Sequence, residues 1–245
     1  MLLSVVIPAF NERITLPSVL PAVVAALPDV DKQIIIVDDG STDGTRDWLR
    51  TQFPGGCLQL DAAPAHAATV EIRVLYHERN SGKGAALRTG FAAATGAVIV
   101  VQDADLEYDP RDWHRMYDLI AGRQSADVVF GCRFYGEPHR SLYFHHFLAN
   151  RLISVLFNIL YNQTLMDIEV CYKMFRREVL DQMQLTCADF GIEIELSAKI
   201  AKSRRWRIYE IGISYFGRTY AEGKKINWRD GVKALWYLLK FRITA

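Results

Sequence analysis

Three acidic residues at alternate positions, Asp103, Asp105 and Glu107, follow directly after an apolar run at 97–101. Carboxylates at i, i+2 and i+4 that leave the end of a strand are able to converge on one hard divalent cation. Without a cation such like charges repel each other, so a purely structural role is the weaker interpretation. The pattern predicts Mg²⁺ or Mn²⁺, held by one or two of these side chains together with the phosphates of a substrate.

A second acidic pair, Asp38 and Asp39, follows another apolar run and precedes Ser41 and Asp43. Paired carboxylates at a strand end are suited to bind a base, a ribose or a cation. Asp, Gly, Ser and Thr are also the usual residues of turns. A capped turn therefore explains this pair about as well as a binding site does.

A glycine-containing segment at 80–84 precedes an Ala-rich stretch and carries Lys83. It lacks the G-x-x-x-x-G-K-[ST] pattern of a phosphate loop, because no Gly stands five positions before Gly82 and Gly84 follows the Lys. Lys83 at the start of a helix is nevertheless suited to pair with a phosphate.

These clusters follow apolar runs that alternate with helical segments. This alternation predicts a doubly wound α/β sheet, mostly parallel, with ligands at the carboxyl ends of its strands. We expect strands at 2–7, 33–37, 70–76, 97–102, 126–131 and 206–215. Helices are expected at 11–26, 41–49, 84–94, 112–122, 142–161, 189–202 and 227–241, with a loop at 51–69. Ser41 or Thr42 is expected to cap the helix at 41–49.

Charge is unevenly distributed along the 245 residues, whose formal net charge is only +1. Residues 199–245 hold 12 Lys and Arg against 3 Asp and Glu, a balance of +9. A basic segment of this kind predicts a face that meets phosphate or membrane, although a solvated basic helix is equally compatible with it. The four cysteines form no CxxC pair and are expected to be reduced thiols of a cytosolic protein.

In this order, the motifs resemble those of the family 2 glycosyltransferases of the GT-A fold. Within that family the likeness is greatest to the dolichyl- and polyprenyl-phosphate sugar synthases, and it covers nearly the whole chain. The segments that carry it are 5–12, 37–43, 80–87, 103–105, 167–173, 190–195 and 217–225. The resemblance implies a Rossmann-like sheet flanked by helices, with amphipathic helices toward the C-terminus. It also implies one domain over 1–245, with a nucleotide-sugar half at about 1–132 and an acceptor- and membrane-facing half at about 133–245.

The resemblance also implies functional roles for individual residues. Those expected at the nucleotide-sugar are Pro8, Phe10, Glu12, Val37, Asp39, Lys83, Asp103, Ala104, Asp105, Arg133, Arg218 and Lys224. Those expected at the metal are Asp103, Asp105 and Glu107, and those expected at the acceptor phosphate are Arg133, Arg140, Arg218 and Lys224. The family usually has Gln at the position of Glu107, so this chain carries an additional negative charge there. Asp105 and Asp167 are the catalytic candidates; a carboxylate at a turn or a helix end is an equally good interpretation of Asp167.

The implied reaction is inverting transfer of a hexose from GDP-mannose or UDP-glucose to a polyprenyl or dolichyl phosphate. A metal and basic residues would stabilise the departing nucleoside diphosphate. A phosphate acceptor is already anionic near neutral pH, so positioning by Arg and Lys matters more than deprotonation.

The segment 227–241 places Trp228, Val232, Leu235, Trp236 and Leu239 on one helical face. Trp beside Lys and Arg is typical of a helix that lies in the headgroup region of a bilayer, and packing of this face on the core is the alternative. The segment 142–161 is a second candidate, with Arg140 and Arg151 directed at phosphates. The sequence shows neither a signal peptide nor a spanning segment. We therefore expect a peripheral protein on the cytoplasmic side of a membrane, either alone or with a membrane-protein partner.

Two other functions are compatible with the same motifs. The first is a family 2 transferase that acts on a sugar hydroxyl, and the second is a non-catalytic module that binds nucleotide-sugars. Nucleic acid is not an expected partner, because the carboxylates at 103–107 repel its phosphates. A dinucleotide-dependent oxidoreductase is disfavoured, since no G-x-G-x-x-G follows the first predicted strand.

Overall fold

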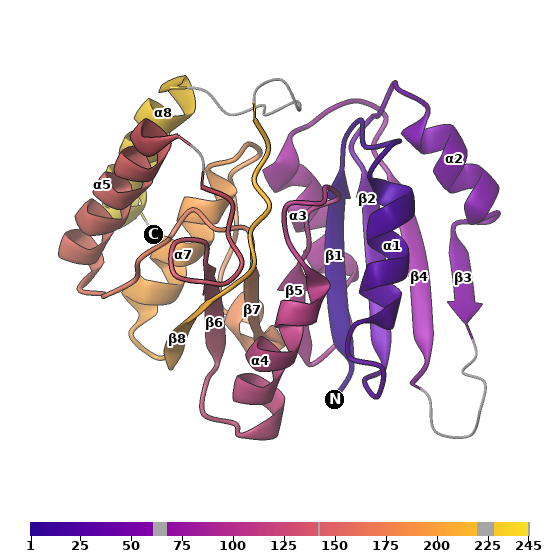
Figure 1. Ribbon diagram of the computed structural model, residues 1–245, viewed down its shortest axis with the longest axis horizontal. Helices are drawn as coiled ribbons and strands as arrows, with labels where there is room; N and C mark the ends of the chain where they lie inside the picture. The colour runs from indigo at the N-terminus through magenta and orange to yellow at the C-terminus, as the bar shows by residue number, and fades with distance from the viewer. Residues whose placement is uncertain (61–67, 142, 220–227, 245) are drawn as a thin grey trace.

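The structure is a computed structural model that describes residues 1–60, 68–141, 143–219 and 228–244 (Figure 1). The described residues build one eight-stranded sheet, in the order β3-β4-β2-β1-β5-β7-β6-β8. Both halves of the chain contribute strands to this sheet. Segments that lie far apart in the sequence therefore meet at the ends of neighbouring strands. The predicted α/β class is confirmed.

The first half of the chain supplies four neighbouring parallel strands. They are β1 (Leu3–Ala9), β2 (Lys32–Asp38), β4 (Val70–Tyr76) and β5 (Val98–Val101). All seven residues of β2 and all four of β5 are buried, as expected for strands covered on both faces. Helices α1 (Leu16–Ala25) and α3 (Lys83–Ala93) lie on opposite faces of this part of the sheet (Figure 1). The acidic clusters therefore emerge at one edge of the sheet.

The second half completes the sheet with a different pattern. Strand β7 (Lys173–Arg176) runs antiparallel between β5 and β6 (Val128–Cys132), and β8 (Ile208–Gly212) is parallel to β6. Three further helical segments, η1 (Pro110–Asp112), α4 (Trp113–Tyr117) and η2 (Asp118–Gly122), follow β5. Because β7 reverses direction, the segment before it returns to the same edge as the acidic residues after β5.

Two long helices pack together at the end of the molecule farthest from β3. Helix α5 (Phe144–Tyr161) contacts α8 (Trp228–Thr244), and α8 also contacts α7 (Ile192–Ser203), which in turn reaches α3 (Figure 1). No helix in the described ranges has the length and apolarity needed to cross a membrane. The helices α5 and α8 confirm the predicted helices at 142–161 and 227–241, with ends that differ by at most three residues.

The predicted boundaries near the first two strand ends are wrong. The helix expected at 11–26 begins only at Leu16, because Asn11 adopts a left-handed φ of 56° and its amide donates to Ser41 Oγ at 2.9 Å. Ser41 is thereby unavailable as a cap. Helix α2 (Thr45–Gln52) begins instead after Gly44, whose φ is 92°.

Three short elements were missing from the predictions. The expected loop at 51–69 contains β3 (Cys57–Leu60), which pairs antiparallel with β4 at the edge of the sheet. Strand β7 and helix α6 (Arg177–Asp181) occupy a region for which no element was predicted. Each is only four or five residues long, which is too short for a hydrophobic period to stand out.

Candidate active site

A half-buried lysine connects the acidic cluster to the second half of the chain. Lys83 Nζ donates to Asp103 Oδ1 at 2.6 Å, lies 2.9 Å from Cys171 Sγ and lies 3.3 Å from Glu193 Oε1 on α7. Burial lowers the pKa of the Lys83 ammonium, but the charges of these three neighbours together raise that pKa well above its ordinary value. Lys83 is therefore a fixed positive charge that orients Asp103.

The other two acidic residues after β5 share one guanidinium. Arg218 Nη2 donates to Asp105 Oδ2 at 2.6 Å, and Arg218 Nε donates to Glu107 Oε1 at 3.0 Å. Tyr215 Oη also donates to Glu107, at 3.1 Å. Burial raises the pKa of the Asp105 carboxyl to about 7, and repulsion from Asp103 and Glu107 adds to this rise. The positive charge of Arg218 is thus too small to offset the effect of burial and repulsion on Asp105.

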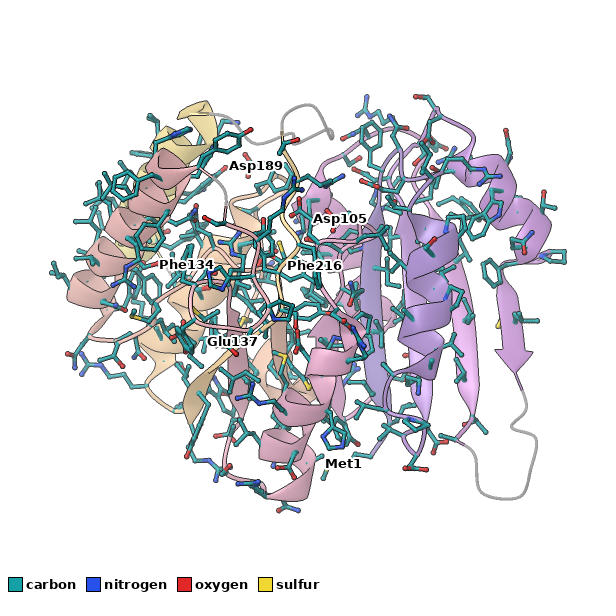
Figure 2. The ribbon with its side chains drawn as sticks, in the orientation of Figure 1. Met1, Asp105, Phe134, Glu137, Asp189 and Phe216 are labelled. Atoms are coloured by element: carbon teal, nitrogen blue, oxygen red, sulfur yellow. The ribbon has the colours of Figure 1, made fainter. Side chains whose placement is uncertain are left out.

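This cluster has the donor chemistry of a site for Mg²⁺ or Mn²⁺. Its oxygen ligands are those that hard divalent cations prefer. Within the part of the chain that the structure describes, no three His, Cys, Asp or Glu side chains gather around one point. Arg218 holds Asp105 and Glu107 instead, so a metal that binds here has to compete with that guanidinium. Figure 2 shows Asp105 near the middle of the molecule, with Phe216 below it in the view.

Asp39 is a buried anchor for the segment at 80–84. Its carboxylate lies 2.7 Å from His77 Nδ1 and accepts from the amides of Ser81 at 2.9 Å and Gly82 at 2.8 Å. Only 3% of Asp39 is exposed. Its oxygens are therefore largely occupied by the protein, and the carboxylate sets the shape of the turn before Lys83.

The remaining residues expected at the nucleotide lie around the ends of β1, β2 and β5. Pro8, Phe10 and Glu12 are half-buried in and after β1, where they adjoin the ends of these strands. Val37 and Ala104 are buried, so their side chains belong to the core and support the site from beneath. Lys224 lies outside the described residues.

A buried ion pair occupies the second half of the site. Arg133 Nε and Nη2 donate to the two oxygens of Asp167, each at 2.7 Å, and the Arg133 amide donates to the same carboxylate at 3.1 Å. Asp167 is fully buried, while the guanidinium lies 5.4 Å from the centre of the Tyr215 ring. Tyr215 therefore places Arg133 next to Glu107 and the acidic cluster. Arg140 lies farther along, where it donates to the Gly217 carbonyl at 3.1 Å.

Glu169 is a half-buried carboxylate to which the sequence motifs assigned no role. Burial raises its pKa to about 7; the nearby charge of Arg133 opposes this rise, and that of Asp167 adds to it. An acid that is harder to ionise in the fold than in the unfolded chain costs stability once the pH exceeds its unfolded pKa. Glu169 is therefore a destabilising charge at neutral pH, held beside the Arg133–Asp167 pair.

Replacing Glu169 with glutamine is expected to stabilise the protein at pH 8 by about 1–3 kcal/mol. The gain should develop as the pH rises from the ordinary value of 4.5 to about 7, because only the wild type has a carboxyl to ionise. Urea denaturation at pH 5 and pH 8 measures it. An equal gain at the two pH values would contradict the assignment.

Several residues of the site were missed because their signals are not local. His77, Glu193 and Tyr215 each hold a predicted site residue that lies 38 to 110 positions away in the sequence, through the contacts given above. No pattern within one segment reveals such a contact. Glu193 lies in the family-like segment 190–195, and Tyr215 is the last residue of the strand predicted at 206–215, but neither was given a role.

Comparisons with known proteins agree with this geometry. The profile of glycosyl transferase family 2 matches residues 4–184. The undecaprenyl-phosphate 4-deoxy-4-formamido-L-arabinose transferase of Aeromonas hydrophila is 30% identical over 225 residues, which are 91% of this chain and 62% of that protein. The polyprenol monophosphomannose synthase of Mycolicibacterium smegmatis is 29% identical over 90% of this chain and 79% of its own length. The chain thus spans less than two thirds of the first of these relatives.

Solved structures share the fold. A glucosyl-3-phosphoglycerate synthase from Mycobacterium tuberculosis, crystallised with Mn²⁺, uridine diphosphate and phosphoglyceric acid, superposes with a TM-score of 0.70. It is 21% identical, and the match covers 99% of this chain and 79% of that one. The likeness confirms the architecture of the sheet and its helices.

Proposed function

This chain belongs to glycosyl transferase family 2, and from that premise we propose that it transfers a hexose, with inversion, from a nucleoside-diphosphate sugar to a polyprenyl or dolichyl phosphate. The observation that carries this proposal is that acidic and basic side chains meet at one edge of the sheet. Asp105 and Glu107 lie beside Arg218 and Asp103 lies beside Lys83, while Tyr215 joins Glu107 to Arg133. Carboxylates are needed to hold the metal that binds a diphosphate, and basic side chains are needed to bind an anionic acceptor.

The donor half of the reaction is assigned to residues 1–132 of a single domain. Asp103, Asp105 and Glu107 would hold Mg²⁺ or Mn²⁺, which stabilises the charge of the departing nucleoside diphosphate. Arg218, once it leaves Asp105 and Glu107, is placed to contact the same phosphates. The sequence motifs assign the same role to Lys224, which lies outside the described residues. The Mn²⁺ and uridine diphosphate bound by the solved neighbour support this assignment.

The acceptor half is assigned to residues 133–245. Arg133 offers a half-buried, planar guanidinium, the group best suited to bind a phosphate with two hydrogen bonds. Asp167 orients that guanidinium and acts as the acidic group beside the acceptor. Arg140 is the outer basic residue on this path. The two relatives named for undecaprenyl phosphate and polyprenol support a lipid-linked phosphate as the acceptor.

The acceptor half also carries an apolar surface, the α5/α8 face, that a bilayer would cover. On α8 the exposed side chains are Val232, Trp236, Leu239 and Ile243, which are 54–82% exposed. On α5 they are Phe144, Phe147, Leu148, Leu152, Val155 and Ile159. Ala234, Leu238 and Phe241 form the buried side of α8, so Trp236 does not pack on the core. Exposed apolar area on two adjacent helices is a docking surface, and Trp beside Lys233 and Lys240 suits lipid headgroups.

We place the protein on the surface of a membrane, on its cytoplasmic side. The described thiols of Cys57, Cys132, Cys171 and Cys187 are all free, which supports a reducing compartment. A membrane-protein partner on the α5/α8 face is compatible with the same surface.

Trp236→Glu is expected to weaken binding to anionic vesicles by about tenfold, because a charge replaces an exposed aromatic side chain of the α5/α8 face. Vesicle co-sedimentation measures it. Ile14→Glu is the matched control, since Ile14 is 89% exposed but lies outside that face. Equal weakening in both variants, or none in Trp236→Glu, would contradict the membrane assignment.

A panel of nucleotide-sugars tests the donor half. We expect UDP-glucose or GDP-mannose to release its nucleoside diphosphate when polyprenyl phosphate is present. A chelator should stop the release and added Mn²⁺ or Mg²⁺ should restore it, because the carboxylates at 103–107 need a cation. Unchanged turnover after chelation would contradict the metal assignment.

A further inference from the structure

A short crossing segment at 186–191, here called the strap, is packed directly on the turn that bears Lys83. A Cβ atom built on Gly82 would lie 2.4 Å from the Ala188 carbonyl oxygen. One built on Gly84 would lie 2.5 Å from that of Cys187. The amide of Ala85, in the first turn of α3, donates to the Ala188 carbonyl at 3.1 Å. The backbone of the strap therefore fixes the position of the Gly82–Gly84 turn.

The other side of the strap is held by α8. Tyr237 Oη lies 3.0 Å and 3.1 Å from the two carboxylate oxygens of Asp189, to which it donates. The Tyr237 ring also covers Gly191, where a Cβ would lie 2.3 Å from Tyr237 Cε2. Lys233, one turn earlier on α8, has its Nζ 3.7 Å from Asp189 Oδ2. In the view of Figure 2, Asp189 lies between α8 and Asp105.

These contacts form a continuous mechanical connection between the α5/α8 face and the donor site. Val232, Trp236 and Leu239 are on the outer side of α8, and Tyr237 is on its inner side. From Tyr237 the contacts run through Asp189 and the strap to Lys83, whose Nζ holds Asp103 at 2.6 Å. We expect movement of α8 to shift the Lys83 turn, because close-packed interiors transmit strain.

We propose that Tyr237 and Asp189 are positioning residues, through which α8 sets the place of Lys83 and Asp103 in the donor site. The proposal rests on the proposed function, since it concerns the binding of that donor. Neither residue is among those assigned to bind the donor. A bilayer that holds α8 against the body of the protein would thereby tighten the binding of nucleotide-sugar, and enzyme that has not reached its lipid acceptor would bind the donor more weakly.

Tyr237→Phe tests the connection, because it removes the hydroxyl but keeps the ring, which is stacked on Phe241 at 5.7 Å. We expect it to weaken binding of UDP-glucose or GDP-mannose, measured calorimetrically with Mn²⁺, by about three- to tenfold. Tyr161→Phe is the matched control. Tyr161 Oη donates to the Leu238 carbonyl at 2.9 Å, so this variant also removes one hydroxyl contact of α8, but at a point outside the strap.

Unchanged donor affinity in Tyr237→Phe, or an equal loss in Tyr161→Phe, would overturn the proposal. Amide hydrogen exchange over residues 83–86 provides a second readout, and it should rise in Tyr237→Phe alone. Vesicles of anionic phospholipid should strengthen donor binding by the wild type and not by Tyr237→Phe; absence of that wild-type response would also overturn it. Failure of the proposed function is seen separately, as a wild type that binds neither nucleotide-sugar.

Discussion

Asp105→Ala is expected to reduce turnover by about 10³-fold or more, while the protein remains folded. Asp105 is the central carboxylate of the cluster, with Asp103 and Glu107 as its charged neighbours and Arg218 as its partner. Removing it takes away a ligand of the proposed metal and one of the two carboxylates that hold Arg218. Turnover with the best donor and polyprenyl phosphate, at saturating Mn²⁺, measures the loss.

The stability of that variant separates a functional loss from a folding loss. The pKa of Asp105 is raised to about 7 by burial and by repulsion, so its charge does not favour the fold. We expect the free energy of unfolding to change by less than about 1 kcal/mol. Asp109→Asn is the control, because Asp109 is on the same loop but pairs with the exposed Arg111 at 2.5 Å. Near-normal turnover in Asp105→Ala, or a matching loss in Asp109→Asn, would contradict the assignment.

Arg133→Met is expected to lower the free energy of unfolding by about 3–5 kcal/mol. Asp167 is fully buried, and Arg133 supplies both of the 2.7 Å side-chain contacts to its carboxylate. Removing the guanidinium leaves a buried charge without its counter-ion. The double variant Arg133→Met/Asp167→Leu should recover most of the loss, since neither charge remains. Chemical denaturation of the two variants measures both effects.

Arg133→Lys isolates the functional part of that ion pair. A lysine keeps the charge opposite Asp167 but loses the planar, two-point geometry of the guanidinium. We expect kcat/KM for polyprenyl phosphate to fall by about tenfold or more, with the KM for the nucleotide-sugar little changed. A change in the KM for the nucleotide-sugar instead would contradict the assignment of Arg133 to the acceptor and would assign it to the donor.

The sequence was informative where a property is local. A continuous apolar run located β2 and an alternating apolar pattern located β4, both almost to the residue. Acidic clusters after apolar runs identified the edge of the sheet that carries the site. The strand β7 was not predictable in this way. Its four residues are a strand because β5 and β6 lie on either side of it, not because of their own period.

The charges of the site show the same division. Asp103, Asp105 and Arg218 were predicted as site residues from their motifs. The basic side chain that pairs with each carboxylate was not predictable, because Arg218 is more than 100 positions away from Asp105 in the sequence. Asp39 was expected to face a nucleotide, yet its carboxylate is largely occupied by His77 and two backbone amides. Partners of this kind become visible only when the folded chain brings distant segments together.

The most direct test of the central claim is to identify the product. The protein is incubated with its preferred nucleotide-sugar, Mn²⁺ and either polyprenyl phosphate in detergent or free sugars, and the products are analysed by mass spectrometry. We expect a polyprenyl phosphate that carries one hexose, formed only when the metal is present and absent from Asp105→Ala. A hexose transferred to a free sugar hydroxyl, with no lipid-linked product, would contradict the account.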